Sequence, residues 1–319
     1  MRKSMLKKVV AISLASFMVT SSFSGVNFGA VINKKIVCKA SETPGEKVDT
    51  GETQHFYGYK DNGFRAPLVG GELESNKKDK LLSAYVPEKY DSRNYGFVTS
   101  VKNQRSLGTC WAFATVAAME SYALSHGLVD SPSDIDLSEY SLAYLAYDDT
   151  SFVDPLGGTD GDYSSVDNIS NCLKYVGGND AYAFKVLSKW AGIVNEEECE
   201  YPLSSTNLPE YRYDASKLSY ILTGMYEISM TERELIKRAI MENGALATYY
   251  YDDDKYRNGN YFYNYELKSC NHAITIVGWD DSISKDNFAL TDENGTHVPE
   301  GDGAWLIKNS WGTGWHDQG

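Results

Sequence analysis

The sequence predicts an α+β fold in two halves, because patterns typical of helices come first along the chain and patterns typical of strands follow them. Apolar side chains recur at helical spacing before Gly244, whereas the segments after it are short, β-rich and separated by Gly, Asp and Asn turns. With 319 residues, of which 42% are apolar, the chain is long enough to bury a sizeable core. A functional site is expected in the cleft between the halves.

Four helices are predicted in the first half. The first, at about 110–126, is expected to be a buried central helix because apolar residues recur along it at helical spacing. The second covers 137–147, and a Gly-, Asp- and Ser-rich loop at 148–167 follows it. The third covers 179–190. The fourth, at 231–243, begins with Thr-Glu-Arg-Glu, which resembles a capping box.

Three strands are predicted in the second half, at 245–251, 273–279 and 304–308. An acidic stretch at 280–303 separates the last two. It lacks the ligand spacing of an EF-hand, so we interpret it as a solvated loop and predict no metal site, with a calcium site as the alternative.

The N-terminal end has the pattern of an export signal. Basic residues precede an apolar run at 9–19, and small polar residues follow, so we predict a signal peptide over 1–40, with cleavage after Ala30 or Ala40. The run is too short to cross a bilayer of about 30 Å, and no later segment is long and apolar enough. We therefore expect a secreted, extracellular protein without a membrane span, with association to a cell wall as a further alternative.

The polar segment 41–86 separates this signal from the compact domain, which is predicted at 87–319. It contains Gly70-Gly71 and a charged run at 74–80, and shows little periodicity, so we interpret it as a prosegment or linker. The net charge is −14, and the charged residues within 1–40 are all basic. Nucleic acids and anionic membranes are therefore not expected partners.

Five cysteines limit the disulfides. Cys38 is expected to leave with the signal peptide if cleavage follows Ala40, and an activated Cys110 must stay free. The others are Cys172, Cys199 and Cys270. One disulfide is the most that they suggest, with Cys172–Cys199 as the pair named.

A cysteine at the start of the first predicted helix has the surroundings of an activated thiol. Cys110 follows a flexible Gly-Thr pair and precedes Trp111. The N-terminus of a helix carries about half a positive charge, which favours the thiolate. Gln104, six residues upstream, is placed to turn an amide N–H toward a developing oxyanion.

His272 is the candidate base for this thiol, because it lies at the entrance to an apolar strand that fixes its imidazole. Asn309 supplies a carbonyl oxygen to orient the ring, and Trp311 can cover that hydrogen bond from water. An amide suffices as the third member if the resting pair is thiolate and imidazolium. The other histidines lie at a helix end, in polar segments or near the chain end: His55, His126, His297 and His316.

Taken together and in this order, the motifs resemble those of papain-like (C1 family) cysteine peptidases, and within them the secreted or cell-wall-associated clostridial type. The similarity runs from about residue 87 to 315. The motifs are Val86-Pro87-Glu88-Lys89-Tyr90-Asp91, Gln104-x5-Cys110-Trp111-Ala112-Phe113, Asn271-His272-Ala273 and Asn309-Ser310-Trp311-Gly312-x-Gly314-Trp315. The resemblance implies two lobes, an N-terminal helical one and a C-terminal antiparallel β lobe, with the active site in the cleft between them.

The resemblance also implies the roles of these residues. Cys110 would be the nucleophile, His272 the general acid and base, Asn309 the orienting residue, and Gln104 with the Cys110 N–H the oxyanion hole. No cofactor is implied. The expected partners are protein or peptide substrates and the chain's own prosegment as inhibitor of a monomeric zymogen.

Substrate contacts follow less directly. The pair Gly177-Gly178 precedes a predicted helix as the family's glycine pair does, with 157–158 as a competing pair and a plain loop as the alternative. Ala273, Tyr249 and Trp311 are candidates to border the substrate pockets, and the first two would serve equally as core residues.

Three features depart from the family pattern. Leu107 stands where relatives often have a bridging cysteine, the spacings between the catalytic residues are long, and the chain ends at Gly319 where the family continues with strands of the β lobe. We therefore expect a C-terminally truncated peptidase domain. The alternatives are a weak or inactive binding homologue on the same fold and a different Cys–His acyl transferase, such as a transglutaminase-like enzyme.

Overall fold

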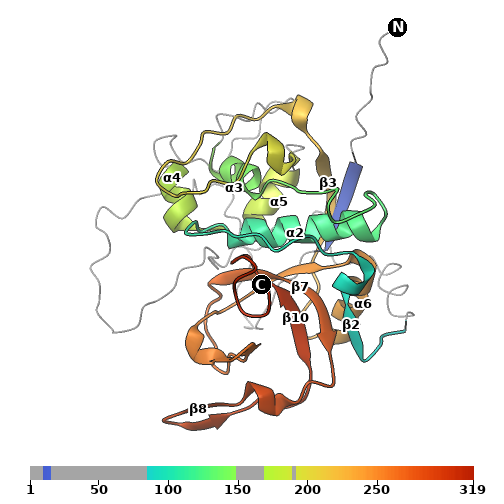
Figure 1. Cartoon of the computed structure of the whole chain (residues 1–319), viewed down its shortest axis with the longest axis vertical. Helices are drawn as coiled ribbons and strands as arrows, with labels where there is room; N and C mark the ends of the chain where they lie inside the picture. Colours follow the sequence, from blue (N-terminus) through green and yellow to red (C-terminus); the bar gives the residue numbers. More distant parts are fainter. Residues whose placement is uncertain (1–9, 16–84, 149–168, 189–191) are drawn as a thin grey trace, which may run out of the picture.

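The computed structural model describes residues 10–15, 85–148, 169–188 and 192–319. It confirms the α+β class: helices form one half, an antiparallel sheet forms the other, and helix α2 (Cys110–Ser125) lies where the two meet (Figure 1). Each half has its own apolar cluster. One gathers around Trp111, Tyr140 and Leu173, and the other around Ile240 and Ile276.

The helical half follows the predicted pattern. Nearly every residue of α2 is buried, as expected for a central helix. Helix α3 (Glu139–Tyr147) starts after Ser138, whose hydroxyl accepts from the backbone of Ser141 and caps the helix. The short α4 (Ile169–Asn171), a π-helical turn η3 (Cys172–Val176) and α5 (Asp180–Ser188) complete this half.

Helix α6 (Arg233–Asn243) packs on the sheet side and begins later than predicted. The expected capping box at 231–234 is wrong. Glu232 is the N-cap residue and makes no side-chain cap, while the Thr231 hydroxyl bonds to the Ser229 hydroxyl, 2.8 Å away. The Thr231 side chain thus bonds to a neighbouring hydroxyl instead of capping the start of the helix.

The sheet is built around β7 (His272–Asp280). Strand β10 (Ala304–Lys308) pairs with one edge of β7, while β4 (Leu246–Tyr250) and β2 (Lys89–Asp91) pair end to end with the other, all antiparallel. All three predicted strands are confirmed within two residues, and β2 was not predicted.

The sequence analysis also missed several short elements. They are β3 (Tyr220–Tyr226), β5 (Arg257–Asn258), β6 (Tyr261–Phe262), β8 (Leu290–Asp292), β9 (Gly295–His297), and the 3-10 turns Ser92–Tyr95, Glu196–Glu198, Ala215–Lys217, Asp254–Tyr256 and Lys285–Phe288. Within the predicted signal peptide, Val10–Ala15 forms β1 and pairs in parallel with β3. Nearly all of the predicted prosegment, the loop after Asp148 and the glycines at 157–158 lie outside the described residues.

The expected disulfide Cys172–Cys199 is wrong. Cys199 is not in a disulfide, while Cys172 is disulfide-bonded. Sequence spacing gave no information on which side chains meet in space, and that decides pairing. Within the parts of the chain that the structure describes, no helix is long and apolar enough to cross a bilayer, and no three His, Cys, Asp or Glu side chains gather as metal ligands.

Candidate active site

Cys110 is the first residue of α2 and its side chain is fully buried at the junction of the halves. The helix dipole at this position favours a thiolate. A backbone N–H from the sheet half also reaches the sulfur: that of Ala273 donates to Cys110 Sγ over 3.4 Å. The thiol of the helical half therefore lies directly beside the residue that follows His272.

His272 opens β7, and its Nε2 lies 2.8 Å from Asn309 Oδ1. The pairing of Lys308 with Thr275 brings Asn309, the next residue after β10, to this end of β7. The backbone N–H of Ser310 also donates to Asn309 Oδ1, over 2.8 Å. Because an amide oxygen only accepts, the ring proton must sit on Nε2, which leaves the lone pair of the neutral ring on Nδ1. This is the tautomer of a general base.

Burial dominates the acidity of His272. It lowers the pKa of the imidazolium to about 3, with Arg257 adding to the decrease and the hydrogen bond to Asn309 opposing it. The ring stacks on Trp311, with centroids 4.7 Å apart and planes 20° apart, and Tyr250 meets it edge-on. Trp311 thus lies over one face of the ring, and its covering role stays a prediction. An isolated imidazolium is costly here, so the ionised pair requires the negative charge of the thiolate.

Gln104 reaches the site because the chain before α2 runs beside the segment after β10. Its backbone N–H donates to Ser310 O over 2.8 Å, and Asn103 pairs with Trp311 in a β-bridge. The Gln104 side chain is buried. Its Oε1 accepts from the Ser310 hydroxyl (2.7 Å), and its Nε2 donates to Leu107 O (2.9 Å). Ser310 thereby fixes which way the amide faces.

The glycine pair before α5 lies against the residue that follows the nucleophile. A Cβ on Gly178 would lie 2.5 Å from the Trp111 indole, and Gly177 has φ +65, so neither position accepts a side chain without strain. The Tyr147 hydroxyl donates to Gly177 O. These glycines therefore form a backbone edge close to Cys110.

Ala273 and Tyr249 face each other across the β7–β4 pair and are both buried in the apolar cluster that contains Cys110. They therefore lie next to the nucleophile. Whether they touch a substrate stays a prediction.

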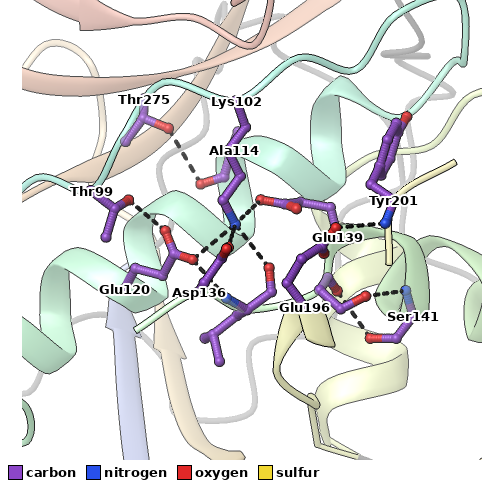
Figure 2. Close-up of polar contacts among 12 residues, drawn as sticks. Thr99, Lys102, Ala114, Glu120, Asp136, Glu139, Ser141, Glu196, Tyr201 and Thr275 are labelled. Atoms are coloured by element: carbon purple, nitrogen blue, oxygen red, sulfur yellow. Dashed lines mark hydrogen bonds and ion pairs between the residues drawn. The ribbon is translucent and has the colours of Figure 1, made fainter. Parts of the chain in front are cut away.

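A second polar group, buried apart from Asp136, was not predicted, and Figure 2 shows most of it. We call it the Lys102 cluster: Lys102, Glu120, Asp136, Glu139, Thr99 and Lys308. Lys102 Nζ lies 3.1 Å from Glu120, 2.6 Å from Asp136 and 2.9 Å from Glu139. Glu120 also accepts from Thr99, whose hydroxyl accepts from Lys308. Because Lys308 precedes Asn309, the cluster joins the helical half to the strand that leads to Asn309.

Sequence reasoning missed Ser310 and the Lys102 cluster. Ser310 lies inside the motif Asn309-Ser310-Trp311. Its hydroxyl, between two candidate site residues, was a signal that could have identified it. For the cluster, the only signal was Glu120, an acid in a helix that is otherwise almost wholly apolar or small.

The described geometry thus combines a thiol at a helix N-terminus, an imidazole held in the basic tautomer by an amide, and a buried glutamine, which is the arrangement of a Cys–His–Asn thiol hydrolase. The comparisons give the family. The family model described as papain family cysteine protease matches residues 86–319, and this chain belongs to that family.

Among curated relatives, a viral cathepsin of Choristoneura fumiferana defective polyhedrosis virus is 31% identical over 238 residues, covering 73% of this chain and 58% of the relative. The probable cysteine protease RD19B of Arabidopsis thaliana is 27% identical over 267 residues, covering 81% of this chain and 62% of the relative. The chain thus spans less than two thirds of the length of either relative.

Two solved structures resemble the model. The cysteine protease and lectin-like domains of Cwp84, a surface layer associated protein of Clostridium difficile, match with a TM-score of 0.51 and 26% identity over 73% of this chain and 46% of that one. Procathepsin L2 from the larval midgut of Tenebrio molitor matches with a TM-score of 0.56 and 23% identity over 83% of this chain and 71% of that one. The second likeness supports the papain-like fold alone.

Proposed function

We propose that this protein is a cysteine endopeptidase, exported as a zymogen, that cleaves peptide bonds through a thioester on Cys110. One observation carries the proposal. The imidazole of His272 is held on Asn309 at 2.8 Å, while the next residue, Ala273, donates its N–H to Cys110 Sγ at 3.4 Å. Nucleophile, base and orienting group from three distant segments therefore meet at one point.

The reaction follows from these positions. His272 takes the thiol proton on Nδ1, and the thiolate attacks the carbonyl carbon of the scissile peptide. The same ring then gives the proton to the leaving amine, after which water attacks the thioester and its proton returns to the imidazole. Asn309 keeps the ring in place through both transfers, and Trp311 excludes water from their hydrogen bond.

The negative charge that develops on the carbonyl oxygen needs donors. The side-chain N–H of Gln104 and the backbone N–H of Cys110, at the start of α2, are assigned this role. In the present state Gln104 donates to Leu107 O, so substrate binding would exchange that acceptor for the oxyanion. The Ser310 hydroxyl keeps the amide from flipping during the exchange.

Substrate binding is assigned to the edge formed by Gly177 and Gly178, which would pair with an extended peptide as a short strand. Ala273, with Tyr249 opposite, would border the pocket for the second residue before the scissile bond. Trp311 would border the leaving side, since its ring lies over His272.

Export, the zymogen form and a monomeric state are proposed from the N-terminal sequence, in which a signal-like segment over 1–40 precedes the polar 41–86. The procathepsin likeness is in keeping with a prosegment, and the Cwp84 likeness with a cell-surface location. The precursor should gain activity on limited proteolysis near residues 81–86, and a fully active uncut precursor would contradict the zymogen.

The function is tested with an epoxysuccinyl peptide such as E-64, which labels an activated thiol in a peptide-binding cleft. We expect one label on Cys110 and hydrolysis of an unfolded protein substrate, both absent in Cys110→Ala. Folded protein that is neither labelled nor active would favour the binding homologue. Labelling with transfer to amines but no hydrolysis would favour an acyl transferase.

A further inference from the structure

The hairpin of β5 and β6 places a guanidinium against the aromatic cover of His272. The Arg257 carbon Cζ lies 5.8 Å from the Trp311 ring centroid and 5.1 Å from that of Trp315, and its side chain is only 11% exposed. Trp315 meets Trp311 edge-on at 4.8 Å. Arg257 thus contacts both indoles, and one of these stacks on the imidazole.

A buried carboxylate anchors this arginine. Arg257 donates from Nη2 to Asp252, whose side chain is fully buried, and the Tyr250 hydroxyl donates to the same oxygen over 2.9 Å. The Asn271 side chain accepts from Asp252 N and donates to Asp252 O. Tyr250 pairs with His272 across the sheet, and Asn271 precedes His272 in the sequence. Asp252 is therefore hydrogen-bonded to both of these neighbours of His272.

We propose that Arg257, anchored on Asp252, is a positioning residue for the proposed hydrolysis. It holds Trp311 flat against His272, and its positive charge disfavours the protonated form of the imidazole. This inference rests on the proposed function. Arg257 touches neither the thiol nor the reacting carbonyl, and acts through Trp311 and through its field.

The charge effect has a defined sign. The ionisable groups around His272 are Cys110 from α2, Tyr250 and Asp252 at the end of β4, and Arg257 from β5. A cation at the position of Arg257 disfavours a second cation on the ring and adds to burial in lowering the His272 pKa. Loss of that cation favours the imidazolium, so the imidazolium should persist to higher pH.

The test compares Arg257→Met, Arg257→Lys and, as a matched control, Lys255→Met, whose ammonium pairs with Glu266 in the same loop. Alkylation of Cys110 by iodoacetate is measured against pH, because an anionic reagent reacts best while the imidazolium is present. We expect the alkaline limb of Arg257→Met at higher pH and kcat for a peptide about tenfold lower with little change in KM. Arg257→Lys should restore the limb, and the control should match the wild type.

A wild-type alkylation profile in Arg257→Met would overturn the inference, as would a shift of equal size in the control. If Arg257→Met fails to fold because Asp252 is left buried and unpaired, the double variant Asp252→Asn/Arg257→Met carries the same test. Alkylation does not depend on peptide cleavage. A shifted limb without hydrolysis would therefore refute the proposed function alone, and hydrolysis with an unshifted limb would refute the role of Arg257 alone.

Discussion

Two polar groups lie close together at the junction of the halves, the Lys102 cluster and the candidate active site. They differ in how charged groups are arranged within them. In the Lys102 cluster, carboxylates face the ammonium of Lys102 directly (Figure 2). At the candidate active site, His272 contacts the Asn309 amide and the Trp311 ring, and Arg257, which pairs with Asp252, also lies against the Trp311 ring. A small cavity whose lining includes Lys102, Glu139 and Asn309 borders both groups.

The difference separates stability from chemistry. Nearby carboxylates outweigh burial and raise the pKa of Lys102, which fixes its charge at every accessible pH. For His272 burial is the largest influence, and it lowers the pKa of the imidazolium to about 3. The Lys102 cluster therefore joins the halves around the fixed positive charge of Lys102, whereas the candidate active site keeps an imidazole whose proton is free to move.

The largest effect is expected from the nucleophile. Cys110→Ala should abolish hydrolysis and E-64 labelling, because no other group at the site can form the thioester, while the free energy of unfolding changes by less than about 1–2 kcal/mol. Turnover assays and denaturant unfolding measure the two effects. Residual hydrolysis sensitive to E-64 would show that another thiol does the chemistry.

Removing the central charge of the Lys102 cluster should act on stability instead. Lys102→Met leaves Glu120 and Glu139 buried without their cation, so the free energy of unfolding should fall by about 3–5 kcal/mol. The folded fraction should keep kcat within a few-fold of the wild type. Lys217→Met, which breaks the exposed pair with Glu198, is the control and should unfold like the wild type. A Lys102→Met protein as stable as the control would break the comparison.

Gln104→Ala should lower kcat by about 10²–10³-fold, because one donor to the oxyanion is lost, with KM and unfolding changed little. Ser310→Ala, which leaves the amide in place but removes the hydroxyl that orients it, should cost only about tenfold. Steady-state kinetics on one peptide compares the pair. Near wild-type turnover of Gln104→Ala would remove the oxyanion assignment.

The sequence predicted the elements whose patterns are local and left out the contacts that are not. Helix α2 and strand β7 are long apolar segments, and their bounds were nearly right. The proximity of His272 and Asn309 was predicted from the resemblance, because each residue lies inside a family motif and the motifs occur in the family's order. Lys102 and Glu139 look like ordinary surface residues in the sequence, and only the packing of α3 against the chain before α2 buries them. The pair Cys172–Cys199 failed for the same reason.

The smallest net effect is expected between pH 4.5 and 6.5, where two slopes of stability against pH oppose each other. Burial lowers the His272 pKa from 6.5 to about 3, so the unfolded chain binds more protons in that range and stability falls as pH drops from 6.5 to 3. Burial raises the Glu139 pKa from 4.5 to about 8 against the pull of Lys102, so the folded chain binds more protons there and stability falls as pH rises from 4.5 to 8.

Each group contributes at most about 1.4 kcal/mol per pH unit, and the two slopes oppose each other between 4.5 and 6.5. Urea unfolding at successive pH values should therefore show a plateau in that range from these two groups. The difference between wild type and Glu139→Gln should grow as pH rises from 4.5 to 8, and that between wild type and His272→Gln should grow as pH falls from 6.5 to 3. If both variants changed stability only on the same side of the plateau, the candidate active site and the Lys102 cluster would titrate together. The electrostatic difference between the two regions would then be wrong.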